Sequence, residues 1–138
     1  MLCDSESVLE AAITAIALAD IDSAAAFFSD NAEITIYAAS QTILLGGTSS
    51  GKDSVRKRLR NILASFDIAR FAPRTVLPCD DGFRTQIDYS FRHRASGQSL
   101  DGVMRVVAAI EDGVIVRWQE YQDGDRMEAF LRLVENEG

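Results

Sequence analysis

The chain has 138 residues, of which 47% are hydrophobic and 25% are charged. This composition predicts one globular domain over residues 1–138 and excludes a disordered chain. The 21 acidic residues outnumber the 14 basic ones, and the net charge of −7 argues against a nucleic-acid partner. No apolar run reaches the ~18 residues of a membrane span, and the acidic start lacks the basic segment of a signal peptide. We therefore expect a cytoplasmic protein without a membrane partner.

The first part of the chain predicts two helices. Ser7 and Glu10 have the spacing of a capping box, in which a hydroxyl and a carboxylate satisfy free backbone N–H groups. Apolar residues then recur at helical spacing as far as Ala19. A second, short helix that carries Phe28 is expected to begin after Asp20 or Asp22.

A strand and a third helix are expected next. Residues 29–31 (Ser-Asp-Asn) predict a break, and residues 32–38 alternate as a strand does. Residues 46–51 are rich in Gly and Ser and predict a loop. From Asp53 onwards an apolar stripe at helical spacing predicts the third helix: Val55, Leu59, Ile62, Leu63 and Phe66. Basic residues between 52 and 60 are interpreted as its solvated face rather than as a nucleic-acid patch.

The second half predicts a β-meander. Turn dipeptides stand at residues 81–82, 96–97 and 112–113, spaced for long antiparallel strands. Pro73 and Pro78 indicate an edge strand or a bulge, and a short closing helix is expected around Met127. Helices followed by a meander predict an α+β fold with a curved antiparallel sheet. Three helices from the N-terminal half should cover its concave side and leave a cone-shaped cavity.

Few residues combine chemistry with a suggestive position. Asp101 and Arg105 lie four apart on one predicted strand and therefore share a face, either as a structural ion pair or as a functional dyad. His93 is the only histidine, so no zinc site is expected, and it is either a polar strand-end residue or a pocket base. Tyr121 and Asp123 end the last predicted strand, where Asp123 could instead cap the closing helix.

Three stretches carry a resemblance to a known family: residues 27–32, 45–55 and 112–123. The last reads Asp-Gly-Val-Ile-Val-Arg-Trp-Gln-Glu-Tyr-Gln-Asp and is similar to the final-strand motif of the SnoaL-like branch of the nuclear transport factor 2-like superfamily. That superfamily includes ketosteroid isomerase, polyketide cyclases and limonene-epoxide hydrolase. The resemblance implies a cone-shaped α+β fold and a homodimer formed through the wide sheet face. Residues 1–51 also hold no Lys or Arg, whereas residues 52–94 hold ten, an asymmetry that favours a homo-oligomer.

The catalytic residues of these relatives carry over only in part. The position of the isomerase's general base is Ile36 here, which cannot take a proton. Asp123 matches the aspartate that ends the strand motif of the epoxide hydrolase. Gln86 stands where the hydrolase's relay needs an arginine, near Asp88, so the relay is incomplete.

These observations lead to a hypothesis about function. A mostly apolar pocket for a small apolar or polycyclic molecule is expected, lined by Phe28, Ile36, Ile62, Phe66, Tyr89, Phe91 and Trp118. The polar residues expected to face it are Asp101, Arg105, His93, Tyr121 and Asp123. Without a cofactor or metal, Asp101 or Asp123 would move a proton and Arg105 or Tyr121 would stabilise an oxyanion, as in an isomerase, cyclase or hydrolase. The alternative is a non-catalytic module that binds a small ligand.

Overall fold

The computed structural model describes residues 5–37, 47–80 and 82–137. The helices and strands follow one another in the order α1 (Ser5–Ala17), α2 (Ile21–Ala26), β1 (Phe28–Tyr37), β2 (Gly47–Ser50), α3 (Lys52–Ser65), β3 (Phe66–Pro73), β4 (Leu77–Cys79), β5 (Gly82–His93), β6 (Ser99–Glu111), β7 (Val114–Tyr121) and α4 (Gly124–Glu137). None of the helices in these described residues has the length and apolar character needed to cross a membrane.

The strands form one sheet in the order β2-β1-β7-β6-β5-β3. Strand β4 lies off this path and pairs with the first residues of β5, whereas β3 pairs with the later ones. The pairings are antiparallel except for β1 with β7, which run parallel. The expected α+β fold with a curved, antiparallel-dominated sheet is confirmed. The parallel pair is an addition to the expected meander: β1 precedes α3 in the chain, yet it lies beside the last strand.

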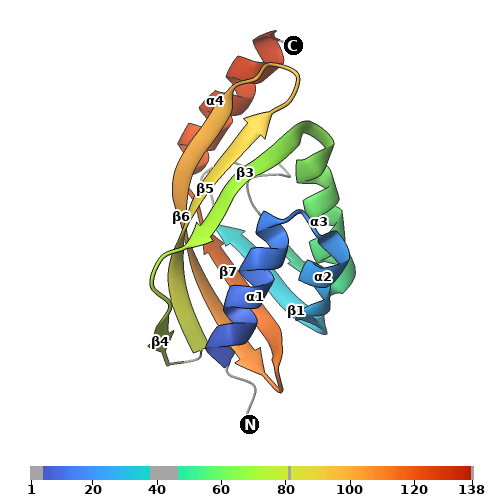
Figure 1. Ribbon diagram of the computed structural model, residues 1–138, viewed down its shortest axis with the longest axis vertical. Coiled ribbons are helices and arrows are strands. Elements are labelled where there is room, and N and C mark those ends of the chain that lie inside the picture. Colours follow the sequence, from blue (N-terminus) through green and yellow to red (C-terminus); the bar gives the residue numbers. More distant parts are fainter. Residues whose placement is uncertain (1–4, 38–46, 81, 138) are drawn as a thin grey trace.

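The sheet curves because its ladders slip at three places. The register shifts between Phe28 and Glu33 in β1, between Ile68 and Arg70 in β3, and in β6 just after Ala109. Each shift leaves one or more extra residues on one of the two paired strands, which bends and twists that strand locally. The bent sheet wraps around α1, which crosses its concave side (Figure 1).

The helix starts differ in part from the expectation. Helix α1 already includes Ser5, so Ser7 lies inside the helix and the predicted capping box is wrong. Helix α2 begins after Asp20, whose side chain accepts a hydrogen bond from the backbone N–H of Ser23 at 3.2 Å. Of the two caps considered for this helix, the structure thus uses Asp20.

The first strand begins earlier than expected. Phe28 opens β1 instead of ending α2, and residues 29–31 belong to β1 rather than to a break. Ser29 accepts a hydrogen bond from the Asn31 backbone N–H at 3.0 Å, which accommodates these polar residues in the irregular start of the strand. Residues 47–50 are strand β2, paired with β1, and not a loop. Residue 38, the expected end of the first strand, lies outside the described residues.

The meander and its edges agree with the sequence. Hairpins join β5 to β6 and β6 to β7 around the predicted turns at residues 96–97 and 112–113. Pro73 ends β3, the outermost strand of the path, and Pro78 lies in the three-residue β4, so neither removes a hydrogen bond from a central ladder.

The core lies between the helices and the concave face of the sheet. Helix α1 packs against β3, α2 packs against α3, and α4 lies near the C-terminal tip, opposite the end where the chain begins (Figure 1). The largest fully buried side chains come from α1 and the central strands: Leu9, Ile13, Ile87, Met104, Ile115 and Val106. Each such side chain contributes roughly 1.5–3 kcal/mol to folding by leaving water. The burial of these side chains therefore holds α1 against the sheet.

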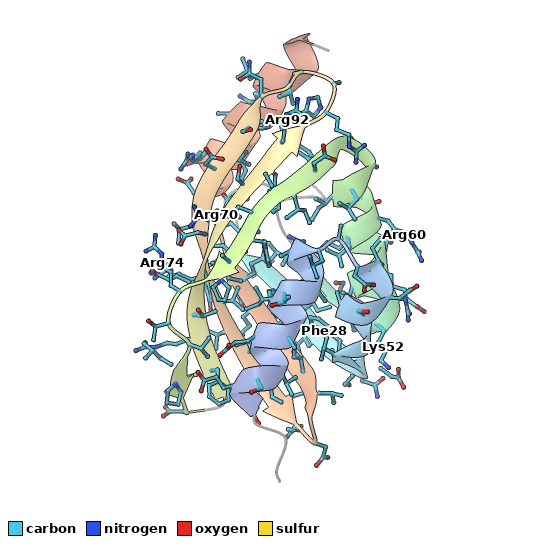
Figure 2. All side chains as sticks on the ribbon, viewed as in Figure 1. Phe28, Lys52, Arg60, Arg70, Arg74 and Arg92 are labelled. Atoms are coloured by element: carbon cyan, nitrogen blue, oxygen red, sulfur yellow. The ribbon has the colours of Figure 1, made fainter. Side chains whose placement is uncertain are left out.

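Most of the basic side of α3 faces solvent, as the sequence predicts, but Arg58 is an exception and turns toward the interior. Lys52 lies 3.6 Å from the Asp30 carboxylate, and Arg56 lies 3.4 Å from Asp22. Figure 2 shows Arg60 pointing away from the body of the protein.

Candidate functional site

A cavity of about 100 Å³ lies between the sheet and the helices. Side chains from α1, α3, α4 and five strands line it, and most of them are aliphatic or aromatic. The polar side chains among the lining residues are Arg58, Glu120 and Gln122, together with the indole N–H of Trp118. An apolar hollow with a few convergent polar groups is the usual form of a small-molecule site.

The polar groups of the cavity converge on the Glu120 carboxylate. Trp118 donates its indole N–H to Glu120 Oε1 at 3.0 Å, and Arg58 Nη2 donates to Oε2 at 3.1 Å. Gln122 donates to the same Oε2 through its amide nitrogen. Glu120 is only 5% exposed and is the one charged side chain classed as buried within the described residues. A buried carboxylate is costly unless it is paired and hydrogen-bonded, and here it is both.

Local structure explains why these groups meet. Residues two apart on a strand share a face, so Trp118 and Glu120 both point inward from β7, and Gln122 follows on the same side. On α3, Arg58 stands three residues after Val55 and four before Ile62, so helical spacing puts it on the apolar stripe. Its apolar stem can lie along the core while its guanidinium reaches Glu120.

The structure places Asp101 and Arg105 on the other side of the sheet. Around Asp101 and Arg105 the buried residues of β6 are the even-numbered Leu100, Met104 and Val106, so these two charged side chains point outward and are exposed. The expectation that both face the cavity is wrong. Their spacing correctly predicted a shared face, but the strand's phase turns that face to solvent, where the charges are hydrated.

Tyr121 joins Arg105 on the outer face. The Arg105 guanidinium carbon lies 5.8 Å from the centroid of the Tyr121 ring, and that ring stacks on Tyr37 with centroids 4.7 Å apart. Both Arg105 and Tyr121 border a hollow of about 700 Å³ on this face, beside the exposed Arg84. Tyr121 therefore does not face the central cavity as expected.

His93 and Asp123 also lie outside the cavity. His93 ends β5, where its Nδ1 is 2.9 Å from the Ser96 hydroxyl and its ring contacts Phe66 edge-on. Asp123 is exposed and accepts a hydrogen bond from the Arg126 backbone N–H at 3.1 Å. This is the helix-capping alternative considered for Asp123. Neither side chain lines the cavity, so the expected position of both is corrected.

The expected apolar lining divides into two groups. The members that line the cavity are Phe28, Ile62, Phe66, Phe91 and Trp118. Figure 2 shows Phe28 among the helices and strands of the interior. Ile36 and Tyr89 are buried in the surrounding core but are not lining residues, which corrects that part of the expectation. Burial raises the pKa of the Tyr89 phenol above its ordinary value, because the charged form would lose its hydration.

Sequence reasoning missed Arg58, Glu120 and Gln122. Two signals were present in the chain. Period-two alternation from Trp118 puts Glu120 and Gln122 on the inward face, and three- or four-residue spacing puts Arg58 on the stripe of Val55 and Ile62. A basic residue on an apolar stripe and an acidic residue on an inward strand face together indicate a buried pair.

The chain belongs to the SnoaL-like domain family. The family's sequence pattern matches residues 9–118, most of the chain and all of α3 and the sheet up to Trp118. No curated protein matches the sequence.

Solved structures of the same fold are similar to this chain at low sequence identity. An NTF2-like protein of unknown function from Burkholderia pseudomallei has a TM-score of 0.80 and 18% identity, covering 93% of this chain and 97% of its own. A protein from Rhodopseudomonas palustris, provisionally named an isomerase, has a TM-score of 0.75 and 20% identity, covering 95% and 98%. A provisionally named polyketide cyclase from Xanthomonas campestris has a TM-score of 0.74 and 15% identity, covering 91% and 94%. A protein from Catenulispora acidiphila described as having a ketosteroid isomerase-like fold has a TM-score of 0.71 and 11% identity, covering 84% and 85%, and these likenesses establish that fold for this chain.

Proposed function

We propose that the protein binds a small apolar molecule in its central cavity and performs cofactor-free acid–base chemistry on it. The reaction would be of the isomerase, cyclase or hydrolase type. The observation that carries this proposal is the buried Glu120 carboxylate beside the Arg58 guanidinium in a mostly apolar wall. Names given to neighbours of the same fold, an isomerase and a polyketide cyclase, support the same reaction class.

Glu120 is the group suited to take a proton. A carboxylate has about four lone-pair directions, and Trp118, Arg58 and Gln122 occupy three of them. The remaining direction can receive a proton from a substrate carbon, while the electron pair moves to a substrate oxygen. Arg58 has further N–H donors besides the one bonded to Glu120, and these can stabilise the negative oxygen.

The size of the cavity limits the substrate. A cavity of about 150 Å³ holds one benzene molecule in a protein core. The present cavity, of about 100 Å³, therefore favours a single small ring or a short branched chain over a polycyclic molecule.

Hydrogen–deuterium exchange tests the chemistry without knowledge of the natural product. The protein is incubated with cyclopentanone in D₂O, and the loss of the protons beside the carbonyl is followed by NMR. We expect exchange faster than in buffer, and its loss in Glu120→Gln, which keeps the shape but not the base. Asp101→Asn and Asp123→Asn are matched controls and should keep the exchange. If exchange is lost in either control while Glu120→Gln remains active, the general base is the substituted aspartate and not Glu120.

A second candidate function is ligand binding without chemistry. The observation that favours it is the same set of three donors, because they already occupy most of the acceptor positions of the carboxylate. This candidate predicts that cyclopentanone shifts the resonances of cavity residues while its protons exchange no faster than in buffer.

We also propose that the outer sheet face forms a homodimer. This face carries exposed apolar surface at Val103 and Tyr37, 42% and 44% exposed, and a stable dimer needs about 800 Å² of buried surface on each partner. Light scattering should give twice the mass of one chain. Val103→Arg should give the mass of one chain, and a single-chain mass for the unsubstituted protein would overturn the proposal.

A further inference from the structure

The cavity contains a hydrogen-bond acceptor that nothing satisfies. Gln122 Oε1 is buried and has no partner within the described residues, although the same side chain lines the cavity. Buried polar atoms in proteins nearly always have a hydrogen-bond partner, and a buried polar atom without one calls for an explanation such as a missing ligand. The orphan atom is an oxygen, so its partner must be a donor.

The orientation of the Gln122 amide follows from its neighbour. Amide nitrogen and oxygen are assigned from the hydrogen-bond network. Here the nitrogen donates to the Glu120 carboxylate. The reversed amide would set its carbonyl oxygen against that carboxylate, and two acceptors repel each other. Glu120 thus fixes Gln122 Oε1 as the outstanding acceptor.

The polar part of the cavity carries no net charge. Arg58 and Glu120 form an ion pair with side chains 25% and 6% exposed, and no other charged side chain lines the cavity among the described residues. A charged ligand would leave water for an apolar hollow whose one cation and one anion already neutralise each other. Such a transfer is strongly unfavourable, whereas an uncharged ligand avoids it.

From these observations we infer that the cavity selects an uncharged, single-ring-sized molecule bearing one hydroxyl group, which donates its hydrogen bond to Gln122 Oε1. This inference rests on the proposed binding function of the cavity and names its ligand class. The ring occupies the apolar hollow beside Trp118. Carboxylates and ammonium compounds of the same size are excluded by the cost of their dehydration.

Three probes that each contain one aromatic ring separate the possibilities: phenol, toluene and benzoate. Trp118 is the only tryptophan, so the ¹⁵N-labelled protein gives one indole N–H resonance, from the group bonded to Glu120 inside the cavity. We expect phenol to shift this resonance with an affinity at least about tenfold higher than that of toluene, since toluene leaves the acceptor unpaired. Benzoate should leave the resonance unmoved.

Substitution of Gln122 tests the assigned atom. Gln122→Met keeps the length of the side chain but removes its whole amide group, and with it the unsatisfied oxygen as well as the donor to Glu120, so phenol and toluene should then bind equally well. Gln119→Met, on the outward side of β7 just before Gln122, is the matched control and should keep the preference for phenol. Both variants are first compared with the unsubstituted protein by their amide spectra, to show that the fold is intact.

The outcomes distinguish a failure of this inference from a failure of the proposed binding function on which it rests. Toluene binding as tightly as phenol, or a phenol preference that survives Gln122→Met, overturns the hydroxyl inference and leaves cavity binding intact. Benzoate binding as tightly as phenol overturns the requirement for an uncharged ligand. If none of the probes moves the indole resonance, cavity binding fails, and the proposed function fails with it.

Discussion

Two acid–arginine sets, whose acidic residues lie on adjacent strands of the sheet, have opposite surroundings. On β6, Asp101 and Arg105 are exposed on the outer face, and no ion pair joins them in the described part of the chain. On β7 and α3, Glu120 and Arg58 meet at 3.1 Å inside the wall of an apolar cavity. Residue types and charges are nearly the same in both sets, but only the buried set is joined by an ion pair.

The comparison shows why burial, rather than residue type, marks the candidate site. An exposed carboxylate keeps its hydration whether or not an arginine lies nearby, so its geometry is loosely constrained. A buried carboxylate must be satisfied by its neighbours, and Glu120 accordingly has three donors. The inner set is therefore held in one arrangement, which binding and chemistry require.

The largest expected effect comes from removing the arginine of each set. Arg58→Met keeps an apolar stem of similar length but leaves the Glu120 charge buried without its cation. We expect a loss of about 3 kcal/mol in the free energy of unfolding, measured in urea. Arg105→Met on the exposed face should change it by less than about 0.5 kcal/mol. Equal losses in the two variants would remove the distinction between the sets.

A second test compares the two faces of β6 at neighbouring residues. Gly102 lies under the Tyr89 ring, and a Cβ atom there would stand 2.6 Å from the Tyr89 hydroxyl oxygen. Because Tyr89 is buried and cannot easily move away, Gly102→Ala should cost about 1–3 kcal/mol through overpacking. The outward Val103 is 42% exposed, and Val103→Ala should cost less than about 0.5 kcal/mol.

Urea unfolding of both β6 variants at one pH gives the comparison directly. A harmless Gly102→Ala would mean that Tyr89 has room to shift, and the inner face would then be less tightly packed than the structure indicates.

Much of the fold could be predicted from the sequence because its signals are local. The stripe from Val55 to Ile62 defines α3, and the turn residues at 96–97 and 112–113 set the long hairpins. The parallel pairing of β1 with β7 could not be predicted in this way, since it joins residues far apart in the chain through the packing of the whole domain. Strand β2 is four residues long, too short to show alternation against its Gly and Ser content.

The candidate site was harder to predict because it depends on strand phase. Asp101 and Arg105 were expected to face inward, yet Val103 and Val107 between and beyond them gave both faces of β6 an apolar character. Sequence alternation tells which residues share a face but not which face is buried. Glu120 could have been assigned from Trp118, since a large aromatic residue fixes the phase of its strand more firmly than valine does.

Asp123 provides a smaller test, of whether its role is structural. Asp123→Ala removes the side chain that accepts from the Arg126 backbone N–H, so α4 should lose its cap at a cost of about 1 kcal/mol in the free energy of unfolding. Asp123→Asn should restore most of this stability, because an amide oxygen also caps helices. An Asn variant as unstable as the Ala variant would mean that the charge of Asp123, and not its hydrogen bond, is what the structure uses.

The smallest expected effect concerns the inner face at alkaline pH. Burial raises the pKa of Tyr89 above the ordinary value of 10.0, so the folded state holds the phenol proton more tightly than the unfolded chain does. Above about pH 10 the Tyr89 phenol of the unfolded chain ionises first, and the free energy of unfolding should fall as the pH rises towards the folded-state pKa.

Tyr89→Phe removes this contribution to the pH dependence. In urea titrations between about pH 8 and pH 11, its stability should therefore fall less steeply than that of the unsubstituted protein. The two proteins should show parallel pH dependence below about pH 9, where the phenol is protonated in both states. A parallel decline above pH 10 as well would mean that water reaches the Tyr89 hydroxyl, and that the inner face at this point resembles the outer one.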